Sequence, residues 1–177
     1  MPPPSTTNSR RKMLRLSRIV SGGQTGVDRA ALDAAIEAGL PHGGWCPLGR
    51  LAEDGLIPPQ YELAETENAD YRFRTECNVV DSDGTLIVYC RPLAGGTLLT
   101  ARLAETHQRP CLLVDLNRRP VVAEIIGWLK EWGIETLNVA GPRESTQPGT
   151  YRRTRRLLTE LLAAVPKRRK RPARLKS

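Results

Sequence analysis

The sequence predicts an α/β domain in which a mostly parallel sheet is covered by helices on both faces. Apolar runs typical of strands alternate along the chain with segments of helical periodicity, which is the pattern of βαβ units. A glycine-rich turn joins the first expected strand directly to an Ala-rich helix. The 177 residues suffice for one domain with tails, whose core needs no metal or disulfide.

The expected elements follow this alternation in order. Strands are expected at about residues 18–21, 44–46, 85–90, 110–116 and 134–140. Helices are expected at about residues 28–38, 71–81, 97–107, 121–132 and 150–165. Glycine and proline mark helix ends, as at Gly39, Pro41 and Gly133.

Two segments carry more specific expectations. The nearly continuous apolar run at 110–116 predicts a strand that is buried on both faces. The segment 47–70 is polar, contains glycines and prolines and has no clear periodicity, so we expect a long loop with little regular structure. Loops of this length in compact domains usually have a function.

The formal charge of +8 is unevenly distributed. Residues 1–18 contain five basic side chains and residues 166–177 contain seven, with no acid in either stretch, so residues 19–165 carry a charge of −4. We therefore expect disordered basic tails at 1–17 and 166–177 around a ligand-binding domain at 18–165. Such tails could hold nucleic acid through weak, salt-sensitive contacts, or could only improve solubility.

No stretch of the chain has the pattern of a membrane span or a signal peptide, so we expect a cytoplasmic protein. The four cysteines lack the spacing of a metal site. We expect them to be reduced thiols, and we expect no metal site.

The turn Ser21-Gly22-Gly23-Gln24-Thr25-Gly26-Val27-Asp28 is the main functional signal. A helix start leaves backbone N–H groups unpaired, and the helix dipole favours an anion there, so this turn could cradle a phosphate. Its glycine spacing is neither that of a P-loop nor that of the dinucleotide fingerprint. The glycines could also serve only to bring strand and helix close together.

Three further segments directly follow expected strands: Cys46–Arg50, Arg91–Thr97 and Gly141–Ser145. The carboxyl ends of parallel strands meet at one edge of a sheet, where ligands bind, so these segments predict a site beside the first turn. Arginines in them suit an oxyanion, although each could be a solvated surface charge. The residues expected to contact the ligand are Gly22, Gly23, Gln24, Thr25, Gly26, Asp28, Arg50, Gly95, Gly96, Thr97, Arg143 and Ser145.

Acidic side chains are also expected near this edge, namely Asp28, Glu53, Asp54, Glu76, Asp81 and Asp83. Asp28 could simply cap the first helix, and Asp81 and Asp83 suit a helix-to-strand turn. The sequence therefore assigns no catalytic residue, and Glu76 and Asp83 stay candidates only.

Several motifs resemble the putative molybdenum carrier family. They are Ser21-Gly22-Gly23-Gln24-Thr25-Gly26-Val27-Asp28-Arg29-Ala30, His42-Gly43-Gly44-Trp45-Cys46-Pro47, Gly49-Arg50, Glu53-Asp54-Gly55, the run from Thr75 to Thr85, and Ala140-Gly141-Pro142-Arg143-Glu144-Ser145. The resemblance spans about residues 18–165. It implies a Rossmann-like domain related to molybdenum cofactor carriers and, more distantly, to LONELY GUY-type phosphoribohydrolases, and the related folds imply a homodimer or larger assembly.

The chain departs from the phosphoribohydrolase motif P-G-G-x-G-T-x-x-E. Gly95, Gly96 and Thr97 keep its glycines and threonine, but Thr100 stands where the glutamate would be. We therefore expect a binding protein rather than an enzyme, with the molybdenum cofactor or a nucleotide as ligand. The alternatives are a nucleotide or nucleoside-phosphate hydrolase that uses loop carboxylates and a protein that associates with nucleic acid through its tails.

Overall fold

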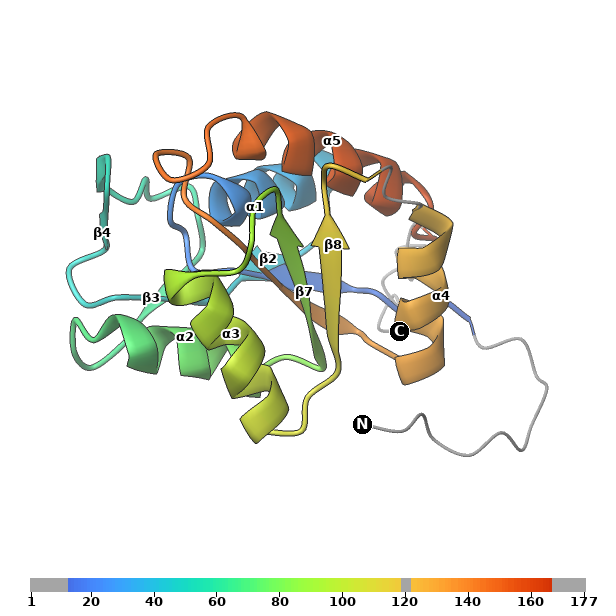
Figure 1. The fold of residues 1–177 in the computed structure, drawn as a ribbon, viewed down its shortest axis with the longest axis horizontal. Helices are drawn as coiled ribbons and strands as arrows, with labels where there is room; N and C mark the ends of the chain where they lie inside the picture. The colour runs from blue at the N-terminus through green and yellow to red at the C-terminus, as the bar shows by residue number, and fades with distance from the viewer. Residues whose placement is uncertain (1–12, 119–121, 167–177) are drawn as a thin grey trace, which may run out of the picture.

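The computed structural model describes residues 13–118 and 122–166, which form three layers (Figure 1). The middle layer is a five-stranded sheet with the order β2-β1-β9-β7-β8, and all its strand pairs are parallel. Its strands are β1 (Arg18–Val20), β2 (His42–Gly43), β7 (Gly84–Tyr89), β8 (Cys111–Asp115) and β9 (Thr136–Ala140). The predicted α/β class with a parallel sheet is confirmed.

Helices cover both faces of this sheet. On one face α1 (Val27–Ala38) and α5 (Thr150–Ala163) pack against each other, and α4 (Val122–Trp132) shares their core. On the other face α2 (Tyr71–Val80) packs against α3 (Gly95–Thr106). The small side chains of α1 let it approach its neighbours closely, and the helix ends at Gly39, whose φ of 68° is the left-handed conformation that glycine adopts readily.

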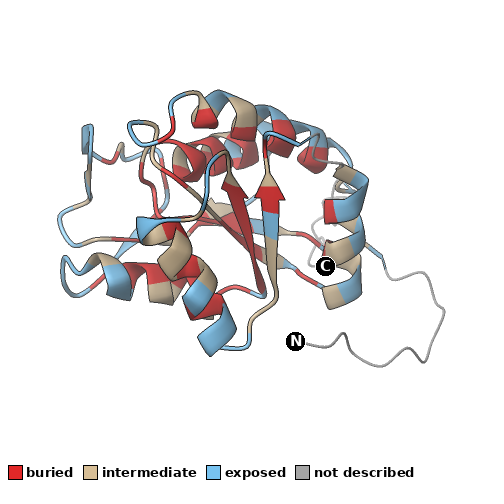
Figure 2. Ribbon diagram, in the orientation of Figure 1, coloured by how far each residue is buried: buried red, intermediate tan, exposed pale blue. Residues whose placement is uncertain are grey.

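The strand β7 lies in the interior of the sheet and is buried along nearly its whole length (Figure 2). The strand β8, by contrast, is one of the two edge strands of this sheet, and Leu113 in its middle is 47% exposed. The prediction that 110–116 is buried on both faces is therefore wrong. An apolar run shows that a segment is hydrophobic, but it does not show where the strand lies in the sheet. Here the strand lies at an edge.

The segment around residue 44 also differs from the prediction. The strand that joins the main sheet is β2, two residues earlier than expected, whereas β3 (Trp45–Cys46) pairs with β6 (Ala64–Glu65) in a separate sheet. Gly44 separates the two strands with a φ of 125°, which bends the chain away from β1.

The expected loop at 47–70 contains short regular elements. Besides β6, it forms an antiparallel hairpin of β4 (Leu51–Ala52) and β5 (Gly55–Leu56) that projects from the molecule at the left of Figure 1. Two-residue strands leave too little periodicity in a sequence to be recognised. This hairpin carries Glu53 and Asp54 to the site described below.

The packed chain begins before residue 18. Leu16 is buried in the main core, and the Ser17 N–H donates to the carbonyl of Glu135 at 2.8 Å. The expected tail residues 1–12 and 167–177 lie outside the described part of the chain. Within the described part, no helix is both long and apolar enough to cross a membrane.

Candidate ligand-binding site

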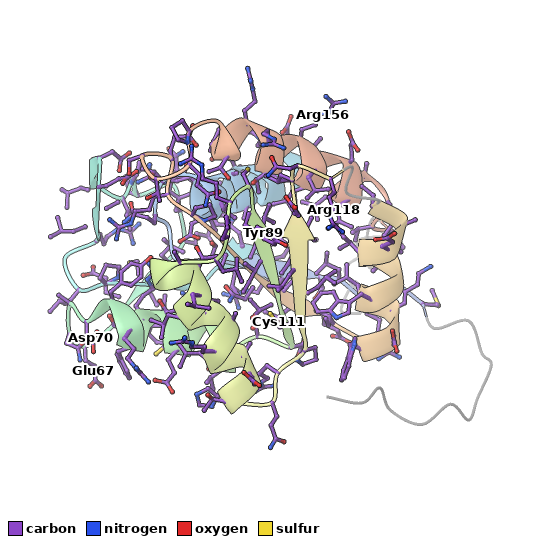
Figure 3. All side chains as sticks on the ribbon, viewed as in Figure 1. Glu67, Asp70, Tyr89, Cys111, Arg118 and Arg156 are labelled. Atoms are coloured by element: carbon purple, nitrogen blue, oxygen red, sulfur yellow. The ribbon has the colours of Figure 1, made fainter. Side chains whose placement is uncertain are left out.

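A pocket of about 410 Å³ opens at the carboxyl ends of β7 and β9. Tyr89, the last residue of β7, lies at the arrowhead of that strand in Figure 3 and lines the pocket. The turn that leads from β7 into α3 and the loop that follows β9 form most of the remaining wall. Of the predicted site residues, the structure brings together Gly95, Gly96, Thr97, Arg143 and Ser145 here.

The electrostatics of this pocket favour an anion. Arg91 and Arg143 are among its lining residues, which include no Asp or Glu. The helix α3 begins at the pocket, its N-cap Ala94 makes no side-chain cap bond, and its first turn contains no acid. Gly95 is exposed with a φ of 51°, and a Cβ added there would meet no other atom within 4 Å. The helix N-terminus is therefore open toward the pocket.

Tyr71 forms one side of the pocket and is stacked by two arginines. The guanidinium carbon of Arg74 lies 4.2 Å from the centre of the Tyr71 ring, and that of Arg143 lies 5.4 Å from it. Both separations fall in the range of cation–π attraction. The Tyr71 ring also leaves little room for a side chain at Gly96 in the first turn of α3, because a Cβ there would lie 3.0 Å from Tyr71 Cε1.

The first glycine turn is filled by the protein itself. The Asp28 carboxylate accepts from the Gln24 N–H at 3.3 Å and lies 3.7 Å from the Arg74 guanidinium, and both charged side chains are buried. Burial raises the pKa of Asp28, while Arg74 and the backbone N–H groups of Gln24 and Gly22 act to lower it. The carboxylate of Asp28 thus takes the place in which the sequence predicted a phosphate.

Internal contacts also account for the glycines of this turn. A Cβ at Gly22 would collide with the Arg74 guanidinium, and one at Gly26 would collide with the carbonyl of Pro142. At Gly23, whose φ is 79°, a Cβ would lie 2.5 Å from Leu63. The reading of these glycines as close-packing residues therefore has direct structural support, whereas their contact with a ligand stays a prediction.

The hairpin turn between β4 and β5 lies over the first glycine turn. The backbone N–H of Glu53 donates to Gln24 Oε1 at 2.9 Å, and Asp54 accepts two hydrogen bonds of 2.9 Å from Arg29. These bonds from Arg29 lower the pKa of Asp54. The Arg29 Nε also donates to the carbonyl of Gly23, so the hairpin and the glycine turn are held as one unit.

The Glu53 side chain reaches from this hairpin to the rim of the pocket. Its carboxylate accepts from the hydroxyl groups of Thr25 and Ser145 and from the Ser145 N–H. Partial desolvation of the carboxylate raises the pKa of Glu53, but the hydrogen bonds from Ser145 and Thr25, with the nearby charge of Arg143, outweigh it and hold the pKa below its usual value.

Arg50 has an internal role. Its guanidinium donates to the carbonyl groups of Ile57, Pro58, Tyr61 and Leu63, at distances from 3.0 to 3.4 Å. It therefore holds the 57–63 segment in place and does not line the pocket.

The two catalytic candidates lie away from the pocket. Asp83 accepts from the backbone N–H groups of Glu135 and Thr136, at the amino end of the sheet. Glu76 pairs with His107 at 2.6 Å, where α2 meets the end of α3. The Thr100 hydroxyl is buried and donates back to the carbonyl of Gly96 within α3.

Tyr89, Thr146 and Gln147 line the pocket but escaped the sequence reasoning. Tyr89 ends a strand, and Gln147 reaches back to accept from the Cys90 N–H at 2.9 Å across 57 residues. The end of β7 is a signal that could have indicated Tyr89. No local signal identifies Gln147, because its role depends on a contact between distant segments.

The parallel sheet with helices on both faces and the site at its carboxyl edge define a Rossmann-like α/β protein. The chain belongs to the circularly permutated YpsA SLOG family, whose model matches residues 19–162. It is also similar to the crystal structure of a putative molybdenum carrier protein from Syntrophus aciditrophicus SB, with a TM-score of 0.81 and 47% identity. That similarity covers 85% of this chain and 96% of the other, and it confirms the resemblance seen in the motifs. No curated protein matches the chain.

Proposed function

We propose that the chain binds a phosphorylated heterocycle, either the molybdenum cofactor or a nucleotide, in the pocket at the ends of β7 and β9. The observation that carries this proposal is the meeting of Arg91 and Arg143 with the open N-terminus of α3 in a pocket whose lining includes no acidic residue. Guanidinium groups and helix N-terminal N–H groups are the donors that phosphate oxygens prefer. The similarity to a putative molybdenum carrier protein supports the molybdenum cofactor among these two ligands.

The donor set fits the phosphate of such a ligand, and the tyrosines of the pocket offer surfaces for its ring. Tyr71 and Tyr89 both line the pocket, and aromatic side chains stack on planar heterocycles. A volume of about 410 Å³ is that of a small-molecule site. In this arrangement Arg143 orients the phosphate and the tyrosines contact the ring.

The identity of the ligand is tested on the full-length protein as purified. Mass spectrometry of co-purifying small molecules, with molybdenum measured on the same sample, should reveal a phosphorylated heterocycle. Calorimetry with the compound so identified then gives its affinity. Arg143→Met should weaken binding by about tenfold or more, because a hydrogen bond to a charged group contributes about 1.5–3 kcal/mol.

Arg156→Met is the matched control. Arg156 is an exposed arginine on α5 that forms an ion pair with Glu160, and it lies outside the pocket lining. This variant removes the same charge and should leave the affinity nearly unchanged. Equal effects of the two substitutions would contradict the assignment of the pocket.

A hydrolase would need an acid or base at the reacting bond. The pocket lining offers no carboxylate. Glu53 at its rim is already bound by Thr25 and Ser145, and Glu144 in the loop after β9 accepts from the backbone N–H groups of Gly149 and Tyr151. We therefore expect no free base to appear when the protein is incubated with purine or pyrimidine nucleoside monophosphates. Release of base above background, measured by chromatography, would favour the hydrolase instead.

A further inference from the structure

The Glu53 carboxylate lies in a nest of donors at the rim of the pocket. Its Oε1 accepts from the Thr25 hydroxyl and from the Ser145 N–H at 3.3 Å, and its Oε2 accepts from the Ser145 hydroxyl at 2.5 Å. Hydroxyl and backbone N–H groups are also the donors that bind phosphate oxygens. The nest therefore has the chemistry of an anion site, and it is filled by an anion of the protein itself.

This nest is continuous with the pocket. Ser145 belongs to both, and Arg143, which lines the pocket, also attracts the Glu53 carboxylate. The Ser145 N–H lies on the loop after β9, and Thr25 lies on the turn after β1. An anion bound beside Arg143 in the pocket would therefore lie next to the nest.

The Glu53 side chain can leave the nest without disturbing the hairpin. Glu53 is exposed, so its carboxylate can rotate into water at little cost in solvation. The turn itself is held by other contacts, which are the bond from the Glu53 N–H to Gln24 and the paired bonds between Asp54 and Arg29. Rotation of one side chain would release the donors of Thr25 and Ser145.

We propose that Glu53 is an internal competitor that occupies a second anion subsite, and that the ligand carries two linked anionic groups, as a diphosphate does. This inference rests on the proposed function. One anionic group binds at Arg143 and the start of α3, and the second displaces the Glu53 carboxylate and binds Thr25 and Ser145. The contacts of Glu53 with Thr25 and Ser145 therefore lower the affinity for a ligand with two anionic groups, whereas a ligand with a single anionic group, which binds only at Arg143 and α3, is little affected.

The test compares inorganic pyrophosphate with orthophosphate by calorimetry on the full chain. Glu53→Gln removes the competing charge, and pyrophosphate affinity should rise about tenfold, the scale of a hydrogen bond to a charged group, with a much smaller change for orthophosphate. Adding Ser145→Ala to this variant should remove most of the gain. Melting curves confirm that each variant is folded.

Glu62→Gln is the matched control for charge. Glu62 is exposed and lies outside the nest and the pocket lining, so removing its charge leaves the nest occupied and should change the affinities for both probes slightly and equally. The unsubstituted protein supplies a second readout. Pyrophosphate at saturation should shift the NMR resonance of the Glu53 carboxyl carbon, and orthophosphate should not.

Three results would overturn the proposal: equal gains from Glu53→Gln and Glu62→Gln, equal gains for the two probes, or a Glu53 resonance that saturating pyrophosphate leaves unchanged. Failure of the proposed function looks different. If the proposed function is wrong, Arg143→Met does not lower the affinity for pyrophosphate or for orthophosphate.

Discussion

The buried pair of Asp28 and Arg74 shows how a single residue can give a glycine turn a structural role. A glycine turn at a helix start is built to hold an anion, and here the anion is the carboxylate of Asp28. Asp28 lies in the first turn of α1, where the helix dipole favours negative charge. Removing one partner of such a buried pair would leave the other charge uncompensated, so we expect the contacts of this turn to contribute to the stability of the fold.

Substitution of Gly22 tests this structural role. Gly22→Ala would place a methyl group in the position of the Arg74 guanidinium and 2.8 Å from Asp28 Oδ2, so we expect a loss of about 1–3 kcal/mol in the free energy of unfolding. Gly127→Ala is the control, because Gly127 is exposed within α4 and a Cβ there meets nothing within 4 Å. It should stabilise the protein by up to about 1 kcal/mol. Urea unfolding measures both, and a neutral Gly22→Ala would contradict the described packing.

At the scale of elements, the strand order decides how much each strand contributes to stability. β7 and β8 are neighbours of similar apolar composition, but β7 has a partner on both sides and β8 has one. Leu86 in β7 is fully buried, whereas Leu113 in β8 is 47% exposed. Hydrophobic stabilisation follows the area removed from water rather than the residue type.

Two identical substitutions measure this difference. Leu86→Ala should cost about 2–5 kcal/mol of unfolding free energy, because it leaves a cavity in the core. Leu113→Ala should cost less than about 1 kcal/mol, since much of that side chain is already in contact with water. Both are read from denaturant unfolding curves with the same m-value. A comparable loss at Leu113 would show that another surface covers the β8 edge in solution.

At the scale of the whole molecule, positive charge is concentrated at the ends of the sequence. Residues 1–18 and 166–177 carry twelve basic side chains and no acid, whereas residues 19–165 carry 15 basic and 19 acidic ones. A net negative domain repels phosphate chains except where arginines gather, as they do at the pocket. Contacts with nucleic acid and contacts with a small anion are therefore expected to depend on different parts of the chain.

Truncation separates these two activities. A chain of residues 13–166 should keep its affinity for the small ligand, because the pocket lies within that range. Affinity of the full chain for RNA or DNA should fall steeply between about 50 and 200 mM salt and be lost on truncation. Gel-shift titrations of both chains at the two salt concentrations provide the measurement. Tight nucleic-acid binding by the truncated chain would mean that the folded surface itself binds nucleic acid.

The sequence by itself determined the class of the fold and the order of its main elements. The helices predicted at 28–38, 71–81 and 150–165 lie close to α1, α2 and α5, because their apolar periodicity and their glycine stops are local properties. The meeting of the loops after β7 and β9 at one edge of the sheet also followed, since it depends only on the strands being parallel.

Only the tertiary structure decided which groups meet at that edge. The hydrogen bonds of Glu53 to Ser145 join residues 92 apart in the chain, and the Asp28 carboxylate fills the turn that by its spacing could equally have held a ligand. The exposed position of β8 depends on the strand order in the same way. Local periodicity encodes how a segment folds, whereas these outcomes arise from contacts between segments, which no single stretch of sequence contains.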